Sequence, residues 1–301
     1  ECSIPSPGDY VAAKMGEDDV LVVRQADGSI RAFLNFCRHR GAQVCAAEAG
    51  NARSFVCTYH GWSYGIDGSL RAVPFEKELY KGCLDKTSHG LVPVARVESY
   101  HGFIYGCFDA NAPSLVDYLG EMRWYLDIWM EATGGVELVG PPARTRLRCN
   151  WKVPSENFVG DAYHVGWTHA AALKVVGGPL AFLSGNAVLP PVGAGRQVTT
   201  RHGHGVGILY EANLALMASI AGELGEWQAH KRPGIEQALG ALRGSFYGAH
   251  LNSTLFPNNS YLWGTNVFKV WSPRGPEEIE IFTWAIVEKD MPEELKLRVA
   301  R

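Results

Sequence analysis

Residues 37–41 have the sequence Cys-Arg-His-Arg-Gly, and residues 57–62 have the sequence Cys-Thr-Tyr-His-Gly-Trp. Each stretch contains one Cys and one His, separated by one residue in the first stretch and by two in the second. Two such ligand pairs on two loops are typical of a metal site, because thiolate and imidazole both bind iron and zinc. Each pair is followed by a glycine, Gly41 or Gly61, which would let backbone amides approach the sulfur atoms.

The alternation of Cys and His within each pair indicates which metal centre is expected. If Cys37 and Cys57 bind one iron and His39 and His60 bind the other, the four side chains hold a [2Fe–2S] cluster in the Rieske arrangement. A structural zinc site also uses two Cys and two His, but its common spacing begins with two Cys close together. We therefore predict a Rieske cluster, with a zinc-stabilised binding protein as an alternative. The other five cysteines are interpreted as ordinary core or surface residues.

The residues around these pairs are predicted to form many short strands. Residues 20–24 and 30–36 are apolar runs joined by Asp27-Gly28, which is a hairpin signal. Turn signals this close together predict a small all-β domain over residues 1–114. Its other expected strands lie at residues 53–57, 69–73, 92–97 and 102–108.

The pattern changes after this domain, and residues 115–301 predict a second domain that mixes helices and strands. The overall fold class is therefore α+β, with an antiparallel sheet in the second domain. Asp290 is expected to cap a last helix that continues to Arg301. The other expected helices are 115–130, 155–171, 211–230 and 235–247, and the expected strands are 136–149, 250–256, 261–271 and 278–288.

Two histidines in the second domain, His164 and His169, are candidate ligands of a second iron. Two His and one carboxylate form the facial triad that holds non-haem Fe(II) with open positions for O₂. A separation of five residues turns about 140° around an ideal helix, so both rings reach one metal only if the helix bends or breaks there. Gly160 and Gly166 allow such a break. Two His alone would more commonly be core or surface residues, but a Rieske cluster in the same chain favours the iron site.

Asp161 lies three residues before His164, on about the same helical face. It is either an ordinary helix acid or a carboxylate that hydrogen-bonds the outer ring nitrogen of His164 and so orients a metal ligand. It could also accept a hydrogen bond from a cluster histidine and so bridge the two metal centres.

These motifs resemble the large (α) subunit of Rieske non-haem iron aromatic-ring-hydroxylating oxygenases, and most closely the naphthalene dioxygenase group. The resemblance rests on Cys-x-His, Cys-x-x-His and the later Glu-Asn-Phe-x-x-Asp-x-Tyr-His-x₄-His, and it covers essentially all 301 residues. It implies a helix-grip-like catalytic domain in which His164 and His169 bind iron. It also implies that Asp161 links His164 to His60 of a neighbouring subunit. Five residues match positions that line the family's substrate pocket: Asn157, Phe158, His250, Asn252 and Trp271.

The resemblance implies cis-dihydroxylation of an aromatic hydrocarbon by O₂, with electrons from NADH. The segment Gly203-His204-Gly205-Val206-Gly207 lacks the spacing of a dinucleotide-binding loop, so NADH would be oxidised by a separate reductase and a ferredoxin would carry the electrons. The family assembles as α₃β₃ or α₃. Its third iron ligand is a carboxylate, expected beyond Arg301, so we interpret the chain as a partial α subunit with an incomplete catalytic domain.

Composition and charge agree with a soluble cytoplasmic enzyme. Lys plus Arg number 28 and Asp plus Glu number 31, so the net charge of −3 gives no reason to expect a nucleic acid or a membrane as partner. Residues 175–195 form the longest uncharged stretch, but their glycines and prolines predict a loop rather than a membrane helix. Seven cysteines without the density of a disulfide scaffold favour a reducing compartment.

Two alternative functions remain from the sequence. A Rieske monooxygenase or O-demethylase would use the same scaffold on an aromatic substrate. A Rieske electron carrier would need the cluster but neither the His164/His169 pair nor a large second domain.

Overall fold

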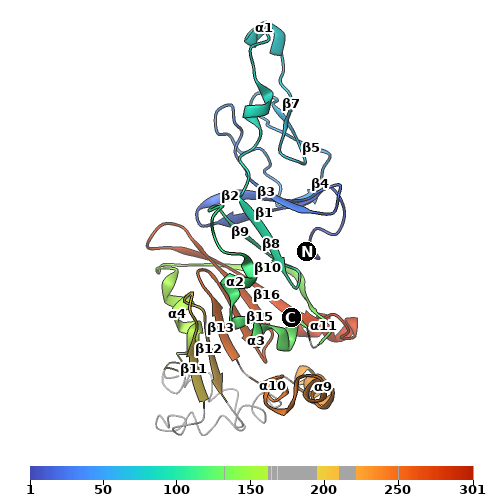
Figure 1. Ribbon diagram of the computed structural model, residues 1–301, viewed down its shortest axis with the longest axis vertical. Helices are drawn as coiled ribbons and strands as arrows, with labels where there is room; N and C mark the ends of the chain where they lie inside the picture. The colour runs from blue at the N-terminus through green and yellow to red at the C-terminus, as the bar shows by residue number, and fades with distance from the viewer. Residues whose placement is uncertain are drawn as a thin grey trace. The chain divides into compact units, whose positions relative to one another are not determined.

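The computed structural model divides into two compact units, Glu1–Leu115 and Val116–Arg301 (Figure 1). The structure describes residues 1–131, 133–161, 164, 168, 195–209, 222–249 and 251–300.

The first unit is built from antiparallel strands, as expected. Its largest sheet has four strands in the order β3-β2-β1-β4. The predicted hairpin at Asp27-Gly28 is confirmed, because β2 and β3 pair antiparallel and Gly28 has a φ of 82°. The strands are β1 (Asp9–Met15), β2 (Asp18–Arg24), β3 (Ile30–Leu34) and β4 (Ala49–Asn51).

Two smaller sheets complete the first unit, one of three strands in the order β5-β6-β7 and one of two strands, β8-β9. The main core lies between the four-stranded and the three-stranded sheets and contains Leu21, Phe33, Phe55 and Tyr64, together with both predicted cluster cysteines. The elements are β5 (Ser54–Val56), β6 (Ser63–Gly65), β7 (Leu70–Ala72), α1 (Glu76–Tyr80), the 3₁₀ helix η1 (Lys86–His89), β8 (Arg96–Tyr100) and β9 (Phe103–Cys107).

One strand of this unit begins later than predicted. Residues 92–97 were expected to form a strand, but β8 starts only at Arg96. Pro93 forms an isolated bridge with Phe33 of β3. On either side of Pro93, the carbonyl of Val92 accepts the N–H of Leu34, and the N–H of Val94 donates to the carbonyl of Ala32. Residues 92–94 therefore pair with β3 only as an isolated bridge, and the regular strand begins at Arg96, where β8 pairs with β9.

The second unit contains a seven-stranded sheet in the order β10-β16-β15-β14-β13-β12-β11 (Figure 1). Neighbouring strands are all antiparallel, which confirms the predicted α+β class. The strands are β10 (Val136–Leu147), β11 (Gly195–Thr199), β12 (Gly205–Leu209), β13 (Leu251–Leu255), β14 (Asn259–Trp263), β15 (Val267–Pro273) and β16 (Ile279–Glu288).

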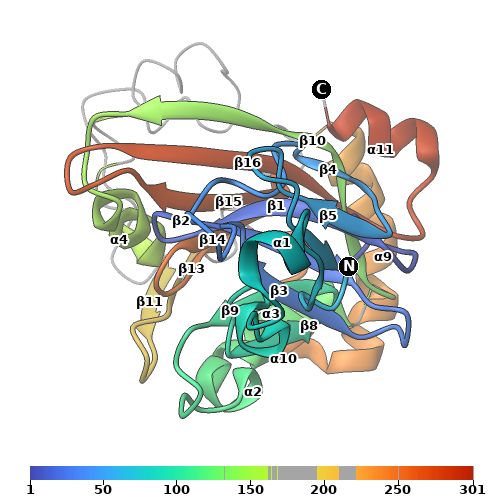
Figure 2. The same ribbon diagram turned by 90° about the horizontal axis from the view of Figure 1, so that it is seen from above.

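Helix α4 (Lys152–Gly160) covers one face of this sheet over β11 to β14 (Figure 2). Gly205 allows the close approach, because a Cβ there would lie 2.3 Å from Cγ1 of Val159. On the opposite face, Trp263 stacks on Trp129 with ring centroids 4.7 Å apart. Trp129 belongs to α3 (Met122–Met130), so the two faces of the sheet are covered by different helices.

Glycines divide two of the predicted helices. The segment 115–130 forms α2 (Leu115–Leu119) and α3, separated at Gly120, whose φ is 49°. The segment 235–247 instead contains the end of α9 (Glu223–Leu239) and the short α10 (Ala241–Gly244), separated at Gly240 with a φ of 81°. A residue with a positive φ cannot continue a right-handed helix. Much of the predicted helix 211–230, and residues 175–194 of the predicted loop, lie outside the described residues.

The prediction of a cap at Asp290 was wrong. The last helix, α11 (Glu293–Val299), begins after Pro292, and no side chain caps it. Asp290 instead accepts a hydrogen bond from Nζ of Lys231 on α9, at 2.8 Å. The expected strand 261–271 is also divided, because Gly264 and Asn266 have positive φ angles and form a turn between β14 and β15.

None of the helices in the described part of the chain is both long enough and apolar enough to cross a membrane.

Candidate cluster and iron sites

Two loops of the first unit have the same backbone geometry. In the first, the N–H of Cys37 donates to the carbonyl five residues later, and the N–H of Gly41 donates back to the carbonyl of Cys37, both at 2.8 Å. The second loop repeats this pattern with Cys57 and Gly61, at 2.9 Å for each bond. The repeated pattern turns both Cys-His pairs in the same way, as a cluster held between two loops requires.

The glycine at the end of each loop is required by the backbone. Gly41 and Gly61 have φ angles of 74° and 72°, in the left-handed region that glycine adopts without steric cost. Gly61 has a second constraint, because a Cβ there would lie 2.8 Å from Cγ of Pro74. These glycines therefore shape the loops that present the four ligand residues.

The four predicted cluster ligands lie on these two loops, and their donor atoms fit a Rieske cluster. Cys37 and Cys57 are buried free thiols, and the rings of His39 and His60 lie with centroids 4.5 Å apart. Nδ1 of His39 is buried without a hydrogen-bond partner, which is costly unless the atom binds something. Burial, followed by the nearby His60 and Arg40, lowers the pKa of His39 and favours the neutral imidazole that a metal requires.

Two aromatic residues that sequence reasoning missed support these ligands. The ring of Trp62 stacks on His39 at a centroid distance of 5.0 Å and an interplanar angle of 7°. The hydroxyl of Tyr64 lies 3.2 Å from Sγ of Cys37 and accepts the backbone N–H of Arg38 at 3.0 Å. Burial is the main reason that the pKa of Tyr64 is raised, so the phenol keeps its proton. Residues 62 and 64 are two positions apart, and side chains with this spacing in a strand point to the same face. This spacing was the sequence signal that both rings point inward.

In the second unit, α4 ends where the predicted iron ligands begin. Its last residue is Gly160, and Asp161 leaves the helical region with a ψ of 72°. The expected helix 155–171 therefore breaks before His164, whereas a common metal for His164 and His169 requires a bend between these two residues. The N–H of Thr168 donates to the carbonyl of His164 at 2.7 Å, which is the i→i−4 bond of a helical turn. His169 lies outside the described residues, so only one of the two predicted ligands is described.

The ring of His164 is held by polar side chains on one side. Its Nδ1 lies 3.1 Å from Oδ2 of Asp161 and 3.4 Å from Nδ2 of Asn157. Because Nδ1 faces the carboxylate, Nε2 is the ring nitrogen that would bind a metal. This carboxylate–histidine pair is the arrangement that orients metal-bound imidazoles in many proteins, so it fits a mononuclear iron.

Two of the predicted pocket residues, Phe158 and Trp271, are in contact. The Phe158 ring meets Trp271 edge-on with centroids 5.3 Å apart, and Trp271 is buried with Nε1 donating to Ser260 at 2.8 Å. They belong to an apolar cluster with Ile279 and Ile281. The structure therefore places both aromatic rings between α4 and the sheet.

Asn252 lies on the same face of the sheet. Its neighbour but one, Thr254, donates from Oγ1 to the carbonyl of Ser155 on α4 at 2.8 Å, so Asn252 also points to the α4 side. Oδ1 of Asn252 is buried without a hydrogen-bond partner. The remaining predicted pocket residue, His250, lies outside the described residues.

Sequence reasoning also missed Lys269 on this face of the sheet. Lys269 pairs with Ser260 in the strand register, and its Nζ donates to Oγ1 of Thr283 at 3.0 Å. Burial lowers the pKa of Lys269. Lys269 lies within the predicted strand 261–271, and only the pairing register shows that its side chain lies on the α4 face of the sheet.

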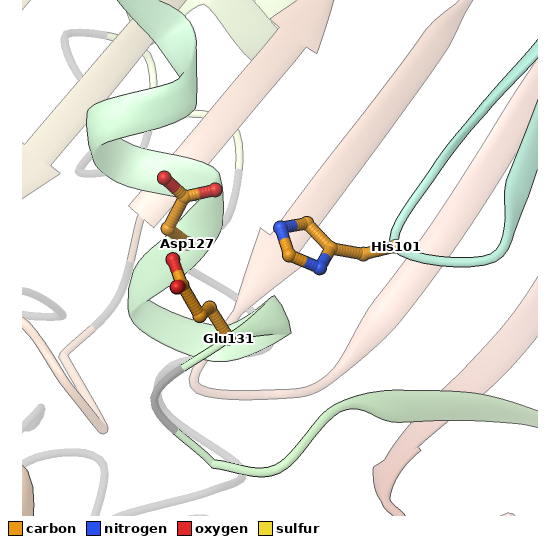
Figure 3. Close-up of side chains that lie close together, drawn as sticks. All are labelled: His101, Asp127 and Glu131. Atoms are coloured by element: carbon orange, nitrogen blue, oxygen red, sulfur yellow. The ribbon is translucent and has the colours of Figure 1, made fainter.

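Asp127 of α3 and Glu131, which follows the last residue of this helix, lie one helical turn apart (Figure 3). Asp127 forms an ion pair with Arg243 at 3.5 Å. His101, also shown in Figure 3, follows β8 in the other compact unit. Because Asp127 already pairs with Arg243, we interpret these two carboxylates as structural rather than as a metal site.

Family models match both units. The Rieske [2Fe–2S] domain matches residues 1–98, and the catalytic domain of the ring-hydroxylating α subunits matches residues 116–301. The chain belongs to the ring-hydroxylating α-subunit family, whose members combine a Rieske cluster with a mononuclear iron. This finding favours the oxygenase interpretation over a zinc-stabilised protein and over an electron carrier.

Individual relatives point to one group within the family. The chain is 56% identical to the large oxygenase component of the naphthalene 1,2-dioxygenase system of Pseudomonas fluorescens, over 99% of this chain and 66% of that protein. It is 54% identical to the large component of the 2,4-dinitrotoluene dioxygenase system of Burkholderia sp. strain RASC, over 99% and 66%. A naphthalene 1,2-dioxygenase structure with indole in its active site has a TM-score of 0.93 and 55% identity, covering 99% of this chain and 67% of that chain. The chain thus spans about two thirds of these proteins.

Proposed function

We propose that this chain is part of the large subunit of a terminal oxygenase that cis-dihydroxylates an aromatic hydrocarbon. O₂ is the oxidant, and the electrons come from NADH through a separate reductase and a ferredoxin. The observation that carries the proposal is the pairing of two matched Cys-His loops in one unit with the Asp161–His164 pair at the end of α4 in the other. A chain that had only the two Cys-His loops could serve as an electron carrier but would have no site for a second iron.

The metal ligands follow from this pairing. Cys37, His39, Cys57 and His60 hold the cluster, and His164 and His169 bind the iron with a carboxylate as third ligand. When bound, the cluster supplies single electrons and the iron supplies the redox chemistry of O₂ activation. The protein keeps both sulfur ligands out of water, because Cys37 and Cys57 are buried.

Asp161 positions His164 and bridges the two metal centres. One of its oxygens accepts from the ring of His164, and the other accepts the backbone N–H of the same residue at 3.3 Å. The Asp161 side chain remains 46% exposed, so a further donor can reach it. We assign this donor, following the family resemblance, to His60 of a neighbouring subunit, which is exposed on its own loop.

The substrate pocket lies between α4 and the sheet. Phe158 and Trp271 supply apolar surface for an aromatic ring, and Asn157 and Asn252 supply polar atoms close to the iron ligand and to the sheet. His250 completes the proposed set. Relatives named for naphthalene and for 2,4-dinitrotoluene favour one-ring or two-ring aromatic compounds as substrates.

The proposed assembly is α₃β₃, or α₃ without a small subunit, in the cytoplasm. The other proposed protein partners are the ferredoxin and the reductase that supply the electrons. We propose neither a nucleic acid nor a membrane as a partner.

The test is product analysis under ¹⁸O₂. The purified holoenzyme is supplied with NADH, reductase, ferredoxin and naphthalene, and the product is examined by mass spectrometry. A cis-diol with two labelled oxygens supports the proposal. A singly labelled phenol, or loss of a methyl group from a methoxyarene without diol formation, would establish a monooxygenase or an O-demethylase instead.

A further inference from the structure

A buried hydroxyl holds the indole nitrogen of Trp271, which is one of the proposed pocket residues. Nε1 of Trp271 donates to Oγ of Ser260 on the neighbouring strand β14 at 2.8 Å. Oγ of Ser260 lies 2.9 Å from Oγ1 of Thr254 on β13, and Thr254 donates to the carbonyl of Ser155 on α4 at 2.8 Å. These groups form a series of hydrogen bonds from β15 to α4, which we call the hydroxyl chain. Ser260 and Thr254 are at most 1% exposed, so the hydroxyl chain lies out of reach of water.

The direction of each bond in the hydroxyl chain follows from proton counting. A serine or threonine hydroxyl has a single proton to donate. Thr254 donates its proton to the Ser155 carbonyl, so it must accept from Ser260. Ser260 therefore donates to Thr254 and accepts from Trp271. Loss of the Ser260 hydroxyl would break both bonds and leave the buried Nε1 of Trp271 without its acceptor, which is costly.

Helix α4 also contacts Trp271 through Phe158, which lies three residues after Ser155 and therefore on nearly the same helical face. The rings of Phe158 and Trp271 meet edge-on with centroids 5.3 Å apart. Trp271 is only 3% exposed, whereas Phe158 is partly buried, so Phe158 offers the accessible surface of the pair. Because α4 leads directly to His164, the hydroxyl chain and the ring contact connect this aromatic surface to the segment that holds the proposed iron ligand.

We propose that Ser260 is a positioning residue that determines how an aromatic substrate lies relative to the iron. The proposal rests on the proposed function, which places the substrate between α4 and the sheet. An indole is apolar on both faces, so packing does not by itself fix its orientation, whereas the hydrogen bond at Nε1 of Trp271 does. The fixed ring of Trp271 holds Phe158, and Phe158 limits where the substrate lies. The ratio of isomeric products therefore reports the position of Phe158, because the orientation of a bound ring decides which of its carbon atoms are closest to the iron.

The test measures the isomeric diols that the holoenzyme forms from 2-chloronaphthalene, whose two rings are not equivalent. The enzyme is supplied with O₂, NADH, reductase and ferredoxin, and the amount of diol on the chlorinated ring is divided by the amount on the unsubstituted ring. We expect Ser260→Ala to change this ratio about fivefold, which is the effect of one lost buried hydrogen bond. Ser253→Ala is the matched control and should keep the wild-type ratio. It removes an equally buried serine hydroxyl from β13, but Ser253 is adjacent to Thr254 and so faces away from α4.

Ultraviolet resonance Raman spectroscopy of the same proteins separates a positioning effect from a general loss of stability. The indole N–H band of Trp271, identified by its absence from Trp271→Phe, should shift in Ser260→Ala and stay unchanged in Ser253→Ala. A shifted band together with a wild-type diol ratio in Ser260→Ala overturns the proposal, and so does an equal change of the ratio in Ser253→Ala. An unshifted band overturns it as well, because the hydrogen bond to Ser260 would then not exist in the enzyme.

Thr254→Val is the second variant if Ser260→Ala does not fold. It keeps the shape of the side chain and removes the link between Ser260 and α4. We expect the diol ratio to change about twofold or more, and a wild-type ratio would overturn the proposal. A wild-type holoenzyme that forms no diol on either ring would refute the proposed function itself, which is a separate outcome.

Discussion

The carboxylate of Asp161 binds His164 twice, through the ring at 3.1 Å and through the backbone N–H at 3.3 Å. One side chain thus fixes both the position of the residue and the orientation of its imidazole. Because α4 ends at Gly160, these two contacts hold His164 beyond the end of that helix. The proposed iron ligand therefore has Nδ1 beside the carboxylate, which leaves Nε2 as the ring nitrogen for a metal.

Asp161→Asn should separate metal binding from electron transfer. The asparagine keeps the size of the side chain but loses the charge that we propose to bridge the two centres. We expect cluster and iron contents close to wild type and a fall in product formation of about 100-fold or more, at the upper end of effects seen for residues that orient metal ligands. Iron analysis, EPR and product yield are the measurements. Glu156→Gln, an exposed acid on the same helix, is the control, and a normal product yield in Asp161→Asn would refute the bridging role.

Gly205 should be coupled to Val159 in a double-mutant cycle. In Gly205→Ala the new Cβ lies 2.3 Å from Cγ1 of Val159 and pushes α4 away from the sheet. We expect a loss of roughly 1–3 kcal/mol in the free energy of unfolding, together with a lower iron content, because α4 leads directly to His164. Val159→Ala in the same chain should recover part of both, as denaturant titration and iron analysis will measure.

Gly234 provides the control for this cycle. It lies within α9, and a Cβ there meets nothing within 4 Å. Gly234→Ala should therefore be neutral or stabilise by roughly 0.5–1 kcal/mol. Strictly additive effects of Gly205→Ala and Val159→Ala would argue against the contact.

The cluster site was predictable from sequence because its chemistry is local. Each Cys-His pair and its glycine span five residues, 37–41 and 57–61, and Asp161 and His164 are three apart. Tyr64 was not predictable, because it bonds a residue 27 positions away only after β6 packs against the first loop. The same holds for Lys269, whose face depends on the register with β14.

The predicted helix boundaries were wrong for a related reason. Gly120 and Gly240 lie within the predicted helices, but the sequence does not show whether a glycine in an apolar pattern will have a positive φ. Asp290 had the composition of a helix cap, yet an ion pair with Lys231 from α9 determined its position. At Asp290 a contact distant in sequence therefore prevailed over a local preference.

Glu288 should be the most costly carboxylate to remove from the second unit. It is buried and accepts hydrogen bonds from Nζ of Lys231 at 2.7 Å, from Nε1 of Trp227 at 3.0 Å and from the hydroxyl of Tyr247. Glu288→Ala leaves these buried donors without their acceptor, and we expect a loss of roughly 3–5 kcal/mol by urea unfolding. Glu294→Gln removes an exposed acid and should change stability little. Equal effects of the two substitutions would contradict the network's role.

His204 should make the second unit sensitive to acid. It is fully buried, accepts the backbone N–H of Phe256 at Nδ1 and donates from Nε2 to the carbonyl of Tyr118, each at 2.9 Å. Burial is the main reason that its pKa is lowered from 6.5 in the folded protein. The unfolded chain therefore binds a proton more readily, so the contribution of neutral His204 is complete above pH 6.5 and is lost as the pH falls below it.

His204→Phe keeps an aromatic ring but leaves the Phe256 N–H and the Tyr118 carbonyl unpaired. At pH 8 we expect a loss of roughly 2–4 kcal/mol in the free energy of unfolding. Since the variant has no proton to gain at this position, its deficit relative to the wild type should shrink between pH 6.5 and pH 5. Urea titrations at these three pH values measure the deficit, and His230→Gln, which replaces an exposed histidine, is the control. A deficit that stays constant with pH would show that His204 does not titrate on unfolding.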